Sequence, residues 1–282
     1  MVLKIFVVGA SGYIGASLYQ AASTEFEVYG TSFSKSGKML DLNLGSPVDF
    51  DYEAVGSNDI VFLTAAISAP DICAREYERA RAVNVVGTSE FIRRIIARGA
   101  RLVFFSSDTV YGEQDLVFDE KAEVRPAGEY AEMKCEVEKL FAGEPLFKSV
   151  RLSYVFSRED KFTKYLKDCA DKGEKAELFH PFYRAVVHRD DVVEGALALA
   201  RRWNEFSCPV INFAGPDVVS RVEFAETLKS GSLPGLEYKV VEPDSEFFKN
   251  RPRIISMSSG LFCQLLGRSA RSLKQAAEIE FP

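Results

Sequence analysis

The stretch that decides the fold stands at the start of the chain and reads Leu3-Lys4-Ile5-Phe6-Val7-Val8-Gly9-Ala10-Ser11-Gly12-Tyr13-Ile14-Gly15. The apolar run predicts a strand, the Gly/Ser cluster predicts a tight turn, and the periodic apolar residues that follow predict a helix near 13–23. Gly9 permits the turn, Gly12 lets a phosphate approach the backbone, and Gly15 lets helix and strand pack closely. Because a helix N-terminus favours negative charge, we expect a dinucleotide pyrophosphate at this turn.

Length, composition and charge limit the class of protein. The chain has 282 residues, of which 47% are apolar, and a net charge of −6. A nucleic-acid-binding surface is not expected, because this acidic chain offers no basic stripe, and the arginine pairs at 93–94 and 201–202 are predicted to lie on solvated helix faces. No apolar run approaches the ~18 residues of a membrane span, and the first strand begins at once. A cytoplasmic protein that does not contact membranes is therefore expected.

Cysteine and histidine usage argues against a metal centre or a disulfide framework. The five cysteines are scattered and form no C-x-x-C pair, so they are predicted to be structural. The only histidines are His180 and His188, which makes a histidine-ligated metal site unexpected. Both are predicted to serve as hydrogen-bonding residues.

Beyond the first turn, predicted strands and helices alternate, which is typical of a parallel sheet covered on both faces. Strands are predicted at Leu3–Val8, Glu27–Gly30, Ile60–Thr64, Leu102–Ser106, Ser149–Leu152 and Val210–Phe213. Further helices are predicted near 74–98 and 129–141, over Asp191–Arg202 with Asp190 or Asp191 as N-cap, and from Ser220 to Lys229 with Glu223 completing a capping box.

The fold class that follows is α/β, a Rossmann-type doubly wound parallel sheet with a smaller C-terminal α/β part that binds substrate. Residues 1–155 are expected to form the dinucleotide-binding domain. Residues 156–282 are expected to form the smaller region, interleaved with late elements of the sheet.

A second motif, Tyr130-Ala131-Glu132-Met133-Lys134, lies on the helix predicted near 129–141. Positions i and i+4 share a helix face, so Tyr130 and Lys134 can point into one cleft. The lysine ammonium stabilises phenolate and would lower the pKa of the tyrosine, which could then protonate a carbonyl. A serine in the segment 104–108 could bond the same oxygen. Such a spacing also occurs on ordinary solvated helices, but beside the Gly-rich turn it predicts an oxidoreductase.

Further segments accompany these two motifs: Thr64-Ala65-Ala66, Asn84-Val85-Val86-Gly87-Thr88, Ser106-Ser107-Asp108-Thr109-Val110-Tyr111-Gly112, Arg151-Leu152-Ser153-Tyr154-Val155-Phe156, Val219-Ser220-Arg221-Val222-Glu223-Phe224-Ala225 and Arg251-Pro252-Arg253. Together they resemble the extended short-chain dehydrogenases/reductases. Within that superfamily the chain most resembles the dTDP-4-dehydrorhamnose reductase family, and the resemblance covers nearly its whole length.

The resemblance implies a role for each matching residue. Tyr130 would be the general acid for ketone reduction, and Lys134 would lower its pKa and hold the nicotinamide ribose. Ser107 would polarise the substrate carbonyl, and Asn84 would support the proton relay. Cofactor contacts are implied for Gly9, Ser11, Gly12, Tyr13, Ile14, Gly15, Asp41, Leu42, Ala65, Ala66, Tyr130 and Lys134.

The choice of cofactor depends on the end of the second strand, where NAD-specific sites place an acid on the ribose 2′-hydroxyl. This chain has no acid in the segment 31–35, and Ser32, Ser34 and Lys35 could bind a 2′-phosphate. NADP(H) is therefore the preferred cofactor, with NAD(H) possible.

The substrate side is implied mainly by the resemblance, since extended family members bind nucleotide sugars between their two parts. Arg184 and Arg251, and also Arg253, could hold the diphosphate. Asp108 beside the active serine and Tyr154 would contact substrate, although rhamnose reductases usually carry tryptophan in place of Tyr154. The segment 157–180, which contains Lys161, Lys164, Lys167 and Lys172, is expected to be a changed substrate loop.

The leading hypothesis is an NADP-preferring reductase of a 4-keto-6-deoxy nucleotide sugar in dTDP-rhamnose biosynthesis. One alternative is an NAD-dependent epimerase or dehydratase of the same superfamily. Dehydratases tend to carry Asp-Glu after the active serine or threonine, whereas this chain reads Asp108-Thr109. A second alternative is a nonenzymatic NADP-binding regulatory subunit. A homodimer formed through the helices near 74–98 and 129–141 is an expectation from the family.

Overall fold

The computed structural model describes residues 3–32 and 39–282. The cofactor contacts predicted for Ser34, Lys35 and the side chain of Ser32 lie outside the described part of the chain.

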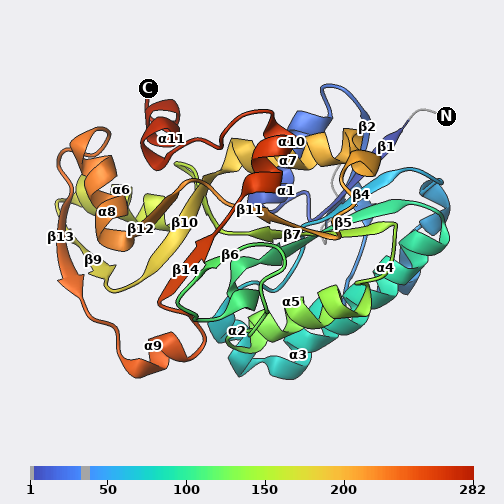
Figure 1. The fold of residues 1–282 in the computed structure, drawn as a ribbon, viewed down its shortest axis with the longest axis horizontal. Coiled ribbons are helices and arrows are strands. Elements are labelled where there is room, and N and C mark those ends of the chain that lie inside the picture. The colour runs from blue at the N-terminus through green and yellow to red at the C-terminus, as the bar shows by residue number, and fades with distance from the viewer. Residues whose placement is uncertain (1–2, 33–38) are drawn as a thin grey trace.

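Seven parallel strands form the main sheet, in the order β3-β2-β1-β4-β5-β7-β11 (Figure 1). Their bounds are β1 Lys4–Val8, β2 Glu27–Ser32, β3 Met39–Asp41, β4 Ile60–Leu63, β5 Arg101–Ser107, β7 Phe147–Leu152 and β11 Val210–Phe213. The strand order reverses between β1 and β4, which makes this the topological switch point where such sheets bind ligands. The predicted Rossmann-type fold is confirmed.

Helices cover both faces of this sheet because β1 alternates its side chains between two apolar cores. Ile5 and Val7 pack with α1 (Tyr13–Ala22), α7 (Arg189–Arg201) and α10 (Gly260–Leu266). Phe6 and Val8 pack on the opposite face with α4 (Thr88–Ala97) and α5 (Glu129–Leu140). In Figure 1 the first group lies above the sheet and the second below it. We call the sheet and these helices the parallel-sheet region.

The helix predicted near 74–98 is wrong as a single element. The chain instead forms α2 (Pro70–Arg75), α3 (Tyr77–Arg81), a π-helical turn (Ala82–Gly87) and then α4. The first helix ends at Glu76, whose backbone leaves the helical region at φ −117° and ψ 45°. Helical structure is continuous from Tyr77 to Ala97, and within it a Cβ on Gly87 would lie 1.5 Å from the carbonyl oxygen of Leu44. The π-helical turn places the Asn84 side chain against the backbone of Ile67, and such turns frequently occur at functional sites.

The remaining strands form two smaller sheets, which with their helices we call the small-sheet region. One has the order β12-β10-β14-β6 with β8 paired to β10, and the other pairs β13 with β9. The strands are β6 Val117–Phe118, β8 Tyr154–Phe156, β9 Lys175–Phe179, β10 Tyr183–His188, β12 Asp217–Ser220, β13 Glu237–Val241 and β14 Ile254–Met257. The helices are α6 Lys161–Lys172, α8 Arg221–Ser230, α9 Ser245–Lys249 and α11 Leu273–Glu280.

Two predictions about this region need correction. The segment 157–180 is not a loop, because the Asp160 carboxylate caps α6 and β9 follows that helix; its five lysines are exposed. Neither Asp190 nor Asp191 caps α7, whose N-cap residue is His188. The Asp191 carboxylate instead accepts hydrogen bonds from the backbone of Arg271 and from arginine side chains before α11.

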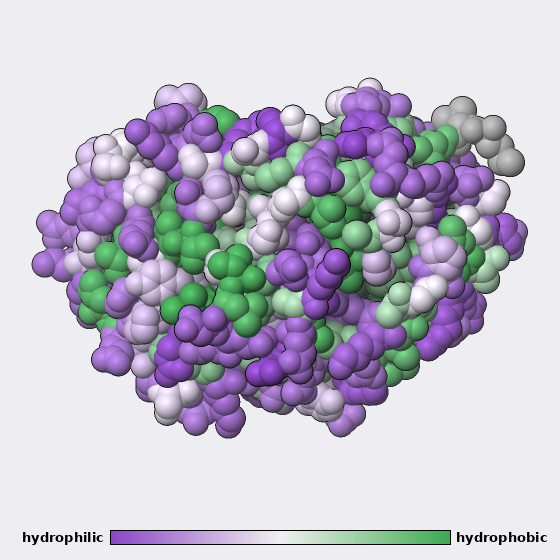
Figure 2. All heavy atoms as spheres, in the orientation of Figure 1, coloured by the Kyte–Doolittle hydropathy of each residue, from purple (hydrophilic) through white to green (hydrophobic). Residues whose placement is uncertain are grey.

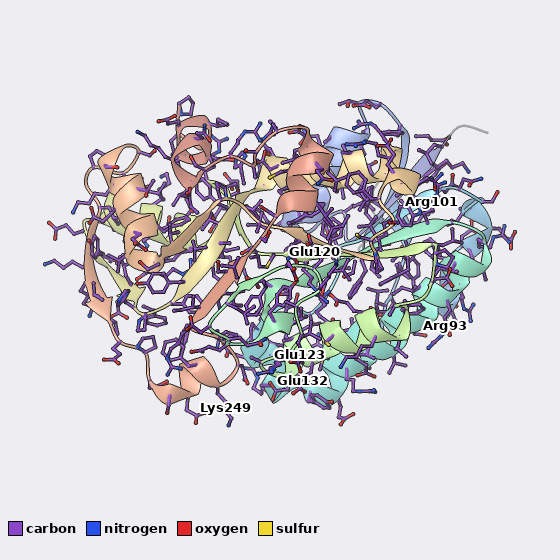
Figure 3. All side chains as sticks on the ribbon, viewed as in Figure 1. Arg93, Arg101, Glu120, Glu123, Glu132 and Lys249 are labelled. Atoms are coloured by element: carbon purple, nitrogen blue, oxygen red, sulfur yellow. The ribbon has the colours of Figure 1, made fainter. Side chains whose placement is uncertain are left out.

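Several other predictions are confirmed. The Ser220 capping box is present at the start of α8. All five cysteines are free. Arg93 is exposed on the outer side of α4, as Figure 3 shows. Within residues 3–32 and 39–282, no helix has the length and apolar character needed to cross a membrane.

Candidate active site

The Gly-rich turn lies at the switch point between β1 and β4. Gly9 adopts φ +89°, and its carbonyl accepts a hydrogen bond from Gly12 N at 2.9 Å. A Cβ on Gly15 would lie 2.1 Å from that same carbonyl oxygen, so only glycine fits there. Helix α1 begins at Tyr13, and its N-cap Gly12 supplies no side-chain cap. The first N–H groups of the helix therefore suit an anion.

Several predicted cofactor residues border this turn. Ala65 lies against Gly9, whose added Cβ would meet Ala65 at 3.0 Å, and Ala66 follows it at the end of β4. Ser11 is exposed in the turn and Ile14 is half-buried. Of the two implied cofactor contacts Asp41 and Leu42, Asp41 ends β3. Leu42 packs in the apolar core, so its side chain supports the sheet.

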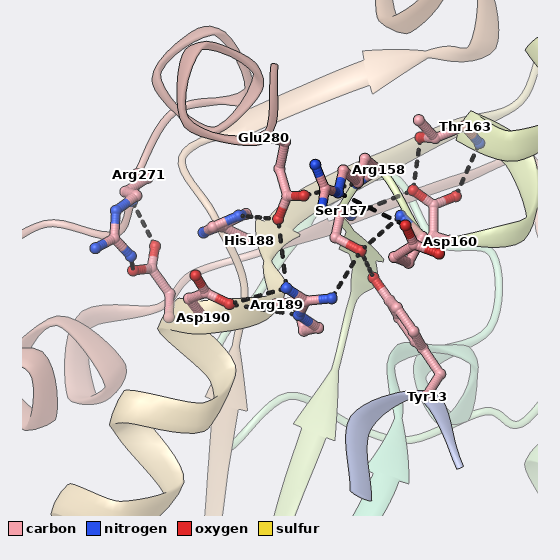
Figure 4. Close-up of polar contacts among 12 residues, drawn as sticks. Tyr13, Ser157, Arg158, Asp160, Thr163, His188, Arg189, Asp190, Arg271 and Glu280 are labelled. Carbon is pink, nitrogen blue, oxygen red and sulfur yellow. Dashed lines mark hydrogen bonds and ion pairs between the residues drawn. The ribbon is translucent and has the colours of Figure 1, made fainter. Parts of the chain in front are cut away.

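Tyr13 links the turn to the small-sheet region. Its hydroxyl lies 2.7 Å from Ser157 Oγ, just beyond β8 (Figure 4). Arg189 donates to the same Oγ at 3.4 Å and forms an ion pair with Glu280 on α11 at 3.6 Å. His188 Nε2 lies 2.9 Å from Glu280, which confirms a hydrogen-bonding role for this histidine. Sequence reasoning missed this network, because its members stand far apart in the chain.

Ser107 lies at the end of β5. With Tyr130, Lys134 and Asn84 it makes up the predicted catalytic residues, which we call the catalytic set. The Ser107 Oγ lies 2.9 Å from Thr109 Oγ1, and it accepts a hydrogen bond from the backbone N–H of Thr109. Asp108 beside it is buried, and Arg184 Nε lies 3.8 Å from its carboxylate. Burial raises the pKa of Asp108, while Arg184 opposes that rise.

Helix α5 brings Tyr130 and Lys134 to the same end of β5. Lys134 is buried, and its Nζ donates to the carbonyl oxygen of Phe105 at 2.7 Å. The same Nζ lies 5.7 Å from the centroid of the Tyr130 ring. The two side chains therefore share one face of α5, as the spacing predicts, and Lys134 fastens the helix to the strand that bears Ser107.

The predicted effect of Lys134 on Tyr130 does not occur in the polypeptide by itself. Burial raises the pKa of Tyr130, and the charges of Cys73 and Asp108 act in the same direction. Burial also lowers the pKa of Lys134 to about 8. The physical reason is that both side chains are buried, and the cost of burying a charge outweighs the attraction between a phenolate and the Lys134 ammonium, whose Nζ is bonded to the Phe105 carbonyl.

Asn84 lies beside this pair, held by the π-helical turn. Its side-chain oxygen accepts from Ile67 N at 2.9 Å, and its Nδ2 donates to Ile67 O at 2.8 Å. The same Nδ2 lies 3.7 Å from Met133 Sδ on α5. Asn84 thus joins the loop after β4 to the helix that carries Tyr130, a supporting position consistent with its expected role.

The small-sheet region contributes a cleft of about 350 Å³, which we call the aromatic cleft, lined by Phe162, Phe179, Phe182, Phe247, Arg221 and Arg251 among others. Figure 2 shows one of several groups of apolar side chains on this face over β10 and β14. Arg251 pairs with Asp71 at 2.7 Å. Tyr154 lies deeper, with its hydroxyl bonded to Asp160, so its ring is held in place.

The remaining predicted arginines lie close to this cleft. Arg184 is buried on β10 and donates to the backbone carbonyls of Tyr183 and Pro252. Burial lowers its pKa to about 10. Arg253 lies outside the cleft-lining set, exposed and 3.5 Å from Glu113. The sequence did not single out Arg221 as a site residue, because the segment around it was interpreted only as a family motif and as the capped start of α8.

Comparison with known proteins adds independent findings. A solved structure of MoeE5 in complex with UDP-glucuronic acid and NAD aligns with a TM-score of 0.83 at 20% identity, covering 99% of this chain and 97% of that one. A UDP-glucuronic acid 4-epimerase from Bacillus cereus, in complex with UDP-glucuronic acid and NAD, aligns with a TM-score of 0.82 at 18% identity, covering 99% and 98%. At these identities the likeness concerns the fold.

Sequence comparison reaches the family. The dTDP-4-dehydrorhamnose reductase of Mycolicibacterium smegmatis (strain ATCC 700084 / mc(2)155) is 28% identical over 163 residues, which are 57% of this chain and 48% of that protein. The match thus spans about half the length of that relative. The model of the family described as RmlD substrate binding domain matches residues 3–249, which is most of the chain. The chain therefore belongs to the RmlD substrate binding domain family.

Proposed function

We propose that this chain is an NADPH-preferring reductase that converts the ketone of a 4-keto-6-deoxy nucleotide sugar to an alcohol. The observation that carries the proposal is the position of Tyr130 and Lys134, which α5 holds against the end of β5 that bears Ser107. This end of the sheet also carries the Gly-rich turn at the switch point. A nicotinamide cofactor and a proton donor would then face one substrate carbonyl.

The turn fits a dinucleotide on its own geometry. Gly9 and Gly15 leave no room for side chains, and helix α1 has no side-chain cap at Gly12. The backbone N–H groups of Tyr13 and Ile14 would hold the pyrophosphate. When bound, the reduced nicotinamide supplies a hydride to the carbonyl carbon.

Residues of the protein donate the proton and stabilise the charge that its loss leaves behind. The Tyr130 hydroxyl gives its proton to the carbonyl oxygen as the hydride adds to the carbon, and the product is the alcohol. Ser107 Oγ, which now bonds Thr109, turns its hydrogen to the same oxygen and polarises it. The ammonium of Lys134 then stabilises the phenolate that Tyr130 becomes.

The cofactor preference rests on the segment after β2. It contains no acid between Thr31 and Lys35, and such an acid would repel a 2′-phosphate. NAD is the cofactor in the solved complexes of MoeE5 and the Bacillus cereus epimerase, so NADH is the second cofactor to assay.

The substrate would span the aromatic cleft and the catalytic set. Arg184 and Arg251 offer guanidinium groups to a diphosphate, which they suit through charge-assisted hydrogen bonds. The phenylalanine rings of the cleft offer faces on which a base can stack.

The test is reduced-cofactor consumption with dTDP-4-keto-6-deoxy sugars, using NADPH and NADH side by side. Wild type should consume NADPH, and Tyr130→Phe should lower turnover by about 100-fold or more. Tyr19→Phe on α1 is the matched control and should leave turnover unchanged. Binding of cofactor without consumption across several nucleotide sugars would overturn the reductase proposal.

The same assay separates two other functions. An NAD-dependent epimerase would interconvert nucleotide-sugar stereoisomers without net consumption of NADH. A nonenzymatic regulatory subunit would bind NADP tightly, turn over no substrate and hold a partner protein.

We also propose that the protein is a cytoplasmic homodimer. Exposed apolar residues lie on the elements expected at the interface, namely Tyr77 on α3, Val86 in the π-helical turn and Leu140 on α5. Light scattering after size-exclusion chromatography should report twice the monomer mass, and Leu140→Glu should return the monomer.

A further inference from the structure

Arg221 differs from the other arginines of the aromatic cleft in its partners. Arg184 faces Asp108 at 3.8 Å and Arg251 pairs with Asp71 at 2.7 Å. Within the described part of the chain, no carboxylate lies within ion-pair distance of Arg221. The nearest acid among the cleft residues, Glu177, is 2.8 Å from Lys239. One half-buried positive charge at the cleft is therefore left without a counter-charge.

Aromatic rings hold the Arg221 side chain. Its guanidinium carbon lies 3.9 Å from the ring centroid of Phe162, 4.6 Å from that of Tyr154 and 5.5 Å from that of Phe182. Tyr154 is itself fixed by its hydrogen bond to Asp160. Stacking on rings fixes the plane of a guanidinium. One edge of the Arg221 guanidinium also bonds the Tyr154 hydroxyl, and its remaining N–H groups can donate to a ligand.

The position of Arg221 is unfavourable for the helix that bears it. Arg221 is the first residue of α8, directly after the N-cap Ser220. A cation at this end of a helix opposes the helix dipole. A residue that breaks a local rule without a stabilising ion pair is a candidate for function.

Arg221 also joins two cavities. It lines the aromatic cleft together with Arg251, and it lines a shallow pocket of about 10 Å³ together with Arg184 and Tyr154. The positive charges of Arg221 and Arg251 both act on Arg184 across this short distance. Three guanidinium groups thus converge where the cleft narrows, and a dianion between them would relieve their repulsion.

We propose that Arg221 is a specificity-determining residue that reads the diphosphate of the nucleotide sugar and so selects diphosphates over monophosphates. The proposal rests on the proposed function for the identity of the sugar nucleotide. Arg184 and Arg251 already have carboxylate partners, whereas Arg221 can give its edge N–H groups to the second phosphate. The rings of Phe162 and Tyr154 hold the guanidinium ready before the ligand arrives.

The experiment is calorimetric titration with dTDP, UDP, TMP and UMP, with the cofactor site saturated by NADP⁺ or NAD⁺, whichever binds more tightly. The proteins are wild type, Arg221→Gln, Arg221→Lys and Lys229→Gln, the last a loss of the same charge on the same helix. Arg221→Gln should weaken diphosphate binding by about 10- to 100-fold and monophosphate binding by less than about 3-fold. Arg221→Lys should recover part of the loss, and Lys229→Gln should change neither.

Cofactor affinity equal to that of wild type shows that each variant is folded. Equal losses for diphosphates and monophosphates, or no loss in Arg221→Gln, would overturn the proposal. A loss confined to UDP-glucuronic acid, measured beside UDP-glucose, would also overturn it, because Arg221 would then read a sugar carboxylate. If diphosphate binding depends on Arg221 while no nucleotide sugar is reduced, the inference stands and the reductase proposal fails.

Discussion

The two regions of the molecule place charged side chains in contrasting ways. In the parallel-sheet region Arg151 lies 2.6 Å from Glu138, and the two side chains are only 6% and 7% exposed. In the small-sheet region Arg221 is half-buried on aromatic rings at the edge of a cleft. A buried pair is complete within the protein, whereas a charge on rings can still bind a ligand. The contrast predicts that the pair of Glu138 and Arg151 serves stability, whereas the Arg221 side chain serves recognition.

The largest expected effect comes from breaking the buried pair. Glu138→Gln leaves the Arg151 charge buried without a carboxylate and should lower the free energy of unfolding by about 3–5 kcal/mol. Glu123→Gln, which breaks an exposed pair with Arg125, is the control and should cost less than about 1 kcal/mol. Urea unfolding measures both. Equal losses in the two variants would remove the contrast between buried and exposed pairs.

A smaller effect, with a pH signature, is expected at Lys134. Burial lowers the pKa of Lys134 from 10.5 to about 8, so between these pH values the unfolded chain binds more protons than the folded one. The contribution of Lys134 to wild-type stability should therefore rise by about 3 kcal/mol between pH 8 and 10.5, at roughly 1.4 kcal/mol per pH unit.

Lys134→Met tests this prediction, because it removes the titrating group. The free-energy difference between variant and wild type should be largest below pH 8 and shrink by about 3 kcal/mol by pH 10.5. Lys139→Met, on the exposed side of the same helix, serves as the control and should follow the wild-type curve. Parallel curves for Lys134→Met and wild type would contradict the predicted cost of burying this charge.

The loss in free energy of unfolding should be larger by about 1–3 kcal/mol for a glycine substitution in the parallel-sheet region than for one in the small-sheet region. In the parallel-sheet region, Gly15→Ala places a Cβ 2.1 Å from a backbone oxygen, so the turn must shift and cofactor affinity should fall with stability. In the small-sheet region, Gly235→Ala meets nothing within 4 Å and should be nearly neutral. Thermal unfolding with and without NADPH measures both quantities. A tolerated Gly15→Ala would show that the turn can relax.

The smallest effect is expected at the contact between the regions. Tyr13→Phe removes the hydroxyl that lies 2.7 Å from Ser157 Oγ and should cost about 1 kcal/mol. A double-mutant cycle with Ser157→Ala isolates the pair. Tyr19→Phe is the control, since within the described residues no hydrogen bond involves its hydroxyl. A coupling energy of zero would mean that this contact does not join the two regions.

Much of the parallel-sheet region could be predicted, because its signals are local. A buried strand followed by a Gly-rich turn and a helix already specifies the switch point, and the Tyr130 to Lys134 spacing specifies one helix face. The interruption at Glu76 and the π-helical turn over Ala82–Gly87 were not predictable in this way, because the Asn84 side chain of that turn bonds the distant backbone of Ile67. The same is true of Asp191, whose carboxylate is taken by Arg271.

The amino-acid sequence by itself determined the α/β class and predicted the phosphate-binding turn and the catalytic residues, because periodicity, glycine placement and i to i+4 spacing act within a few residues. Only the tertiary structure decided the order of the small sheets, where β14 pairs with β6 from far earlier in the chain. It also decided the direction of the Tyr130 pKa and the unpaired position of Arg221, since burial and counter-charges come from residues that meet only on folding.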